Sequence, residues 1–123
     1  MRLRDQLLAA LHPPARSGVV DERVEGTKSI RVVLRPDGDV QIEFHLPGRA
    51  GSPFEQLFVL PPDEKEAAVD EICQFVDGLL NEKIVLAVDG RLVRGGRRWV
   101  SPEELNRVAK LRFSASWHGT FDR

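Results

Sequence analysis

Apolar and polar residues alternate along two neighbouring stretches of the chain, residues 29–35 and 40–46. A period of two places alternate side chains on one face of a β-strand. The segment between them, Pro36–Asp39, has Pro and Gly where a turn favours them. The pattern predicts a β-hairpin with one polar face and one apolar face, the latter made by Ile30, Val32, Leu34, Val40, Ile42, Phe44 and Leu46.

Other stretches predict further strands. Residues 54–60 are apolar on both faces, which predicts a central strand. Residues 83–88 and 91–100 flank the turn signal Asp89-Gly90 and predict a second hairpin, interrupted at Gly95 and Gly96. Residues 110–118 alternate and predict a terminal strand that presents Ser116 and His118 on one face. Residues 15–29 show no clear period, so we expect a loop there, with at most a short strand at its valines.

Three stretches have helical patterns. Leu3, Leu7 and Leu11 share a stripe that Pro13 and Pro14 end. The main helix is expected over residues 62–82, where apolar residues recur at helical spacing. A short helix should begin at Ser101, because an N-cap Ser, a Pro and a Glu follow in the favoured order. The order of elements predicts a single α+β domain over residues 1–123: an antiparallel sheet of about five to six strands, with the main helix and shorter helices packed on one face.

Composition places the chain among globular proteins, with 41% apolar and 30% charged residues. Its one cysteine, Cys73, lies on the apolar stripe of the main helix and favours a reducing compartment. We expect a cytoplasmic protein, since residues 1–11 do not resemble a signal peptide and no apolar run approaches the ~20 residues that span a bilayer. The sequence favours neither a monomer nor a homodimer.

Charge is distributed unevenly, although the net charge is −1. Residues 1–35 carry a net charge of +3, residues 36–90 carry −9 and residues 91–123 carry +5. Such blocks either neutralise one another in the fold or leave oppositely charged faces that attract a charged partner.

Candidate catalytic groups are few. His12, His45 and His118 lack metal-ligand spacing, so neither a metal nor a cofactor is expected. Ser116 and His118 on one strand face, with His45 nearby if the strands pair, would be needed for a small enzyme. No GxSxG segment accompanies them. We therefore expect a protein without catalytic residues and keep this enzyme as an alternative.

Two charged segments are candidates for partner binding. The first is the basic hairpin "VRGGRRWV" and its flank, which matches neither phosphate-binding glycine motif. Arginines beside a tryptophan bind nucleic acids by phosphate contacts and stacking, and they also form protein hot spots. The second is the acidic side of the main helix, suited to a basic partner. The candidate partner-binding residues are Arg91, Arg94, Arg97, Arg98, Trp99, Asp63, Glu64, Asp70, Glu71 and Asp77.

The C-terminal segment "SASWHGTFDR", Ser114–Arg123, and the general plan of the chain resemble the small cytosolic immunity proteins of bacterial toxin systems. This resemblance implies a single α+β domain without catalytic residues that binds and neutralises a cognate toxin, and it assigns no functional residue. A binder of nucleic acid or of a phosphate ligand through the basic hairpin is the alternative.

Overall fold

The fold combines helices with antiparallel sheets, as expected for an α+β chain. The computed structural model describes residues 2–90 and 96–123. The chain divides into two units, Met1–Gln74 and Phe75–Arg123, and helix α2 (Lys65–Leu80) crosses the boundary between them. Instead of one sheet of five to six strands, the described residues form a four-stranded sheet in the first unit and a three-stranded sheet in the second.

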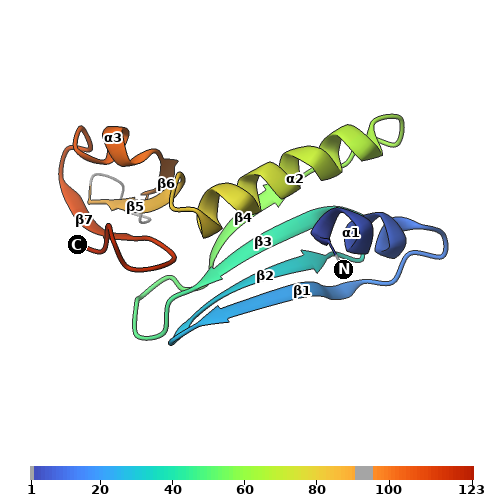
Figure 1. Ribbon diagram of the computed structural model, residues 1–123, viewed down its shortest axis with the longest axis horizontal. Helices are drawn as coiled ribbons and strands as arrows, with labels where there is room; N and C mark the ends of the chain where they lie inside the picture. The colour runs from blue at the N-terminus through green and yellow to red at the C-terminus, as the bar shows by residue number, and fades with distance from the viewer. Residues whose placement is uncertain (1, 91–95) are drawn as a thin grey trace. The chain divides into compact units, whose positions relative to one another are not determined.

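The predicted hairpin is the centre of the four-stranded sheet. Strand β2 (Lys28–Leu34) pairs with β3 (Val40–His45), and β1 (Gly18–Glu25) and β4 (Phe54–Phe58) complete the order β1-β2-β3-β4 (Figure 1). At the turn, the Arg35 N–H donates to Asp39 O at 2.8 Å and Gly38 has φ 91°, which explains the glycine. The alternating apolar side chains form the core of this unit at no more than 1% exposure each: Ile30, Val32, Leu34, Val40, Ile42 and Phe44.

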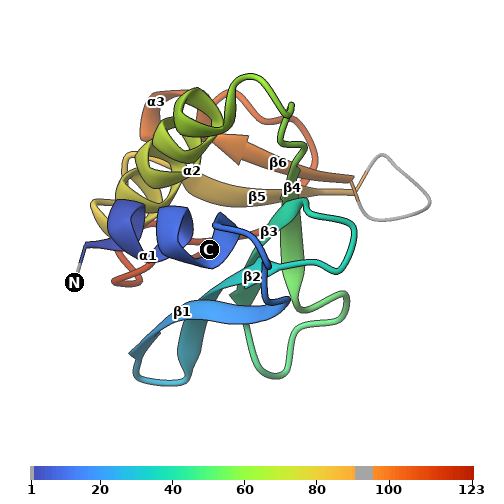
Figure 2. The same cartoon turned by 90° about the vertical axis from the view of Figure 1, so that its right-hand side faces the viewer.

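Helix α1 (Leu3–Leu11) lies over one side of this sheet (Figure 1, Figure 2). It buries Leu7 and Leu11 and ends before the two prolines, as predicted. Its Arg4 Nε donates to Asp70 Oδ1 at 2.9 Å, which ties α1 to the first half of α2. The other side of the sheet, which we call the outer face, faces away from α1.

Two strands differ from their predictions. The segment expected to be mainly a loop forms the eight-residue strand β1, whose register shifts between Val19 and Asp21. This shift inserts one extra residue and interrupts the alternation that would have revealed the strand. Strand β4 was expected at the centre of a sheet, but it pairs only with β3 among the described residues and leaves Leu57 42% exposed.

The second unit contains a three-stranded sheet in the order β6-β5-β7. Strand β5 (Val85–Asp89) is buried along its whole length between β6 (Gly96–Val100) and β7 (Leu111–Ala115). Helix α3 (Pro102–Leu105) packs Leu105 into the core on one face, together with Val85, Ala87 and Val100. The predicted cap is confirmed: Ser101 Oγ accepts from the Glu104 N–H, and the Glu104 carboxylate accepts from the Ser101 N–H.

The C-terminal end of α2 explains the glycine in its interior. Gly78 O accepts from the N–H groups of both Lys83 and Ile84, at 2.8 and 3.0 Å, so the chain folds back over the helix. A Cβ atom at Gly78 would lie 2.5 Å from Ile84 Cδ1 and 2.8 Å from Ile84 Cγ1. Glycine at this position therefore leaves room for the Ile84 side chain.

We expect Gly78→Ala to destabilise the protein. Alanine favours a helix by about 1 kcal/mol over glycine, but overpacking costs about 1–3 kcal/mol. The net loss in the free energy of unfolding should be about 1 kcal/mol, measured by denaturant titration. Ile84→Val removes the nearest atom, so the same glycine substitution should cost less in that background. If Gly78→Ala lowered the free energy of unfolding equally in both backgrounds, overpacking against Ile84 would not be the cause of the destabilisation.

Candidate functional site

The basic hairpin does not present its described arginines on one surface. Arg97 lies opposite Val88 and Arg98 lies opposite Ala87, so the two exposed side chains point to opposite faces of strand β6. Arg91 and Arg94 lie outside the described residues. Arg97 and Arg98 therefore lie on opposite faces of the same strand, and their role in partner binding stays a prediction.

Trp99 lies between these arginines and the buried end of the strand. It is half-buried, and its ring meets that of Phe75 edge to face, with centroids 5.3 Å apart and an interplanar angle of 85°. Such a pair adds about 0.5–1.5 kcal/mol to the burial of the two rings. This contact gives Trp99 a structural role within the second unit.

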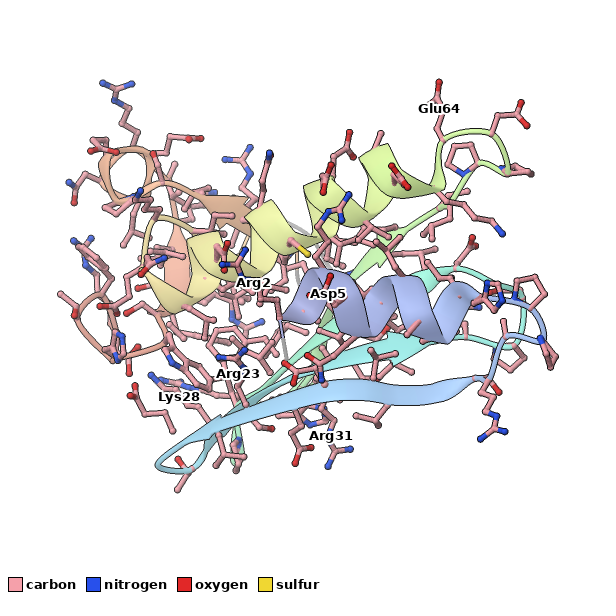
Figure 3. All side chains as sticks on the ribbon, turned by 45° about the vertical axis from the view of Figure 1, so that its right-hand side comes forward. Arg2, Asp5, Arg23, Lys28, Arg31 and Glu64 are labelled. Carbon is pink, nitrogen blue, oxygen red and sulfur yellow. The ribbon has the colours of Figure 1, made fainter. Side chains whose placement is uncertain are left out.

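The acidic residues of the main helix are exposed but not equivalent. Asp63 and Glu64 precede the first residue of α2, and Figure 3 shows Glu64 projecting outward there. Asp70 is engaged by Arg4, whereas Glu71 and Asp77 are exposed on the helix itself. No large apolar side chain is exposed beside them on α2.

The residues proposed for a small enzyme occupy different settings. His45 lies on β3 and its Nε2 is 3.0 Å from Glu43 Oε1. Strand β7 ends at Ala115, so Ser116 and His118 do not share a strand face, contrary to the prediction. Ser116 is 1% exposed and its Oγ accepts from the Phe121 N–H at 3.0 Å, whereas His118 is exposed.

The segment from Ser114 onward folds into a turn that is closed by its own hydrogen bonds. Ser114 and Arg123 pair their backbones in both directions, at 3.3 and 3.2 Å. The Ser114 hydroxyl donates to Phe121 O at 2.6 Å, and Asp122 Oδ1 accepts from the Ser116 N–H at 2.9 Å. The small polar residues of this segment thus satisfy its backbone, which is what such a compact turn requires.

Glu82, which the sequence did not single out, anchors this turn from the end of α2. Its carboxylate accepts from the N–H groups of His118 and Thr120, each at 3.2 Å, and from the Thr120 hydroxyl at 2.6 Å. Partial burial opposes the charged form, but hydrogen bonds from the Ser116 and Thr120 hydroxyls and from both backbone groups outweigh it and lower the pKa of Glu82. The chain reverses direction after α2, and this reversal brings the Glu82 carboxylate to the turn that contains His118 and Thr120.

The outer face of the four-stranded sheet brings together residues from all of its strands. The register aligns one row of Val19, Val33, Gln41 and Leu57, and a second row of Glu22, Arg31, Glu43 and Glu55. A third, shorter row contains Val24, Ser29 and His45. Figure 3 shows Arg31 on this face, away from α1, and Arg23 on the opposite side.

Large apolar side chains are exposed on this face. Val19 is 56% exposed, Val24 65% and Leu57 42%, and Val59, just beyond β4, is 68% exposed. These four are the exposed large apolar residues of the described chain. Val19 and Leu57 lie at the two ends of the first row, on the edge strands β1 and β4, with Val33 and Gln41 between them. Aliphatic and charged side chains thus share this face of the sheet.

Comparison with known proteins found no match, whether among protein families, curated proteins or solved structures. In residues 2–90 and 96–123, no three His, Cys, Asp or Glu side chains are grouped as metal ligands. None of the helices described is both long and apolar enough to cross a membrane.

We expect the Glu82 contacts to stabilise the protein at neutral pH and to weaken in acid. Because the pKa of Glu82 is lower in the folded chain, its contribution is complete above the unfolded pKa of about 4.3–4.5 and is lost as pH falls through the folded pKa. Glu82→Gln should reduce the free energy of unfolding at pH 7 by about 1–2 kcal/mol, a figure discounted for partial exposure.

The measurement is denaturant unfolding of both proteins from pH 7 to pH 3. The difference between them should shrink on acidification, while Glu71→Gln, an exposed helix control, should change stability by less than about 0.5 kcal/mol. A pH-independent difference would contradict the role of the charged carboxylate.

Proposed function

We propose that this chain is a non-enzymatic protein-binding domain of the immunity or inhibitor type, which binds and neutralises a cognate protein through the outer face of its four-stranded sheet. The observation that carries the proposal is the exposure of Val19, Val24 and Leu57 on one open face. Removal of exposed apolar surface from water is the main favourable contribution to most protein–protein association.

The outer face suits this function better than the two charged segments do. Arg97 and Arg98 point away from each other, and the exposed side of α2 offers charge without large apolar groups. Charged groups at an interface chiefly set the rate and specificity of association, whereas burial of apolar surface supplies much of the affinity. The outer face has both kinds of group side by side.

The immunity or inhibitor assignment also draws on the resemblance carried by Ser114–Arg123. In the second unit those residues hold a closed turn, so we place binding on the sheet and a structural role on the turn. The protein would then block its partner by covering a surface, without performing a reaction.

Co-expression with the product of the adjacent gene tests this function. We expect the two proteins to co-purify as one complex and any growth arrest caused by the partner to be relieved. Val19→Thr with Leu57→Thr places a β-branched residue suited to a strand at both positions and reduces the exposed apolar surface, and should weaken the complex about tenfold or more.

Arg97→Ser with Arg98→Ser is the comparison variant and should bind as the unaltered chain does. If the arginine variant lost binding while the Val19→Thr, Leu57→Thr variant kept it, the interface would lie on β6 and not on the outer face. Failure to recover a complex with the adjacent product would overturn the assignment as an immunity protein.

A further inference from the structure

Two carboxylates on the outer face lie directly opposite each other. Glu43 on β3 is the register partner of Glu55 on β4. Side chains of such pairs approach within about 4.5–5.5 Å at Cβ, and like charges in this position destabilise a sheet. Within residues 2–90 and 96–123, no cation lies within ion-pair distance of Glu55. The free chain thus carries an electrostatic cost at this place.

The Glu43 carboxylate is held in position by its strand neighbours. Gln41 Nε2 donates to Oε2 at 2.9 Å, and His45 Nε2 lies 3.0 Å from Oε1. The side chain is only 17% exposed, so it has little freedom to turn away from Glu55. An acceptor fixed in this way is prepared for a cationic donor at low entropic cost.

Arg31 does not neutralise the row. It lies opposite Glu43 across the β2–β3 pairing, but its Nε donates to Glu22 on the other side. The row therefore contains three carboxylates and one guanidinium. The excess of negative charge lies on the β3–β4 side, beside the exposed Leu57.

We propose that the outer face binds a protein segment that places Lys or Arg side chains on Glu43 and Glu55 and apolar side chains on the flanking aliphatic groups. This inference rests on the proposed function and adds the chemistry of the partner. The apolar and acidic rows are two residues apart on β3 and β4, which is about 7 Å along a strand. An extended segment matches that spacing when its basic and apolar residues lie two positions apart, because side chains i and i+2 share one face of a strand.

Charge also argues against a second copy of the chain as the occupant. Two outer faces packed together would bring two carboxylate-rich rows into one interface. Like charges brought together in an interface cost several kcal/mol. A basic partner instead relieves the repulsion between Glu43 and Glu55.

Three short synthetic peptides test the proposal, with the repeats Lys-Ser-Leu-Ser, Gln-Ser-Leu-Ser and Glu-Ser-Leu-Ser, which place both kinds of residue on one face of an extended chain. We call them the Lys–Leu, Gln–Leu and Glu–Leu peptides. Each is titrated into isotope-labelled full-length protein, and the amide resonances are followed by NMR. We expect the Lys–Leu peptide to shift resonances of β3 and β4 and to bind about tenfold more tightly than the Gln–Leu peptide. The Glu–Leu peptide should not shift them.

Glu43→Gln with Glu55→Gln should remove the advantage of the Lys–Leu peptide. Glu64→Gln with Glu71→Gln is the control. It changes the net charge by the same amount, in and just before α2, and should leave the advantage of the Lys–Leu peptide intact. The single variant Glu55→Gln should also raise the melting temperature of the free protein, since it removes a like-charge pair. A higher melting temperature would show that the Glu55 carboxylate does not stabilise the free protein, as a purely structural role would require.

Equal binding of the Lys–Leu and Gln–Leu peptides at the outer face would overturn the basic partner and leave the proposed function standing. Equal effects of the two double variants would show attraction to overall charge and would also overturn it. A dimer that Leu57→Thr dissociates, measured by sedimentation, would make a second copy the occupant. Failure of the co-expression experiment alone would count against the proposed function.

Discussion

The register between β2 and β3 is the constraint on which the first unit depends. It sets Ile30 opposite Phe44 and Val32 opposite Ile42, with all four side chains in the core. A slip of one residue would move the core side chains of the shifted strand to the outer face, so burial fixes the pairing strongly. The same register decides which polar groups meet outside. Arg31 lies opposite Glu43 because the core requires its neighbours to point inward.

The elements that could be predicted are those with an uninterrupted pattern. The β2–β3 hairpin, helix α1 and the cap at Ser101 each have a local signal that the fold does not override. Strand β1 could not be found because its irregularity at Val19 disrupts the alternation and both of its faces are largely exposed. The division into two sheets depends on which strands pair across the chain, and no local pattern contains that information.

The candidate site was missed for a related reason. Apolar residues on both sides of β4 indicated burial, whereas the structure leaves Leu57 exposed at the edge of the described sheet. Strand β4 is thus more apolar than its position at the edge of the described sheet requires. The alternation did place Glu43 and His45 on the polar face. The position of Glu43 opposite Glu55 followed only from the pairing with β4.

The closed C-terminal turn affects how sequence similarity and mutational data should be interpreted. Its hydroxyl and carboxylate groups are engaged with one another and with Glu82, so substitutions there act on folding first. In a mutational scan that measured only partner binding, substitutions of Ser116 and Thr120 would lower binding by disturbing the fold. Both residues would then look like interface positions although neither needs to contact a partner. Two proteins that share such an ending share a way of closing a chain, and their binding surfaces remain free to diverge.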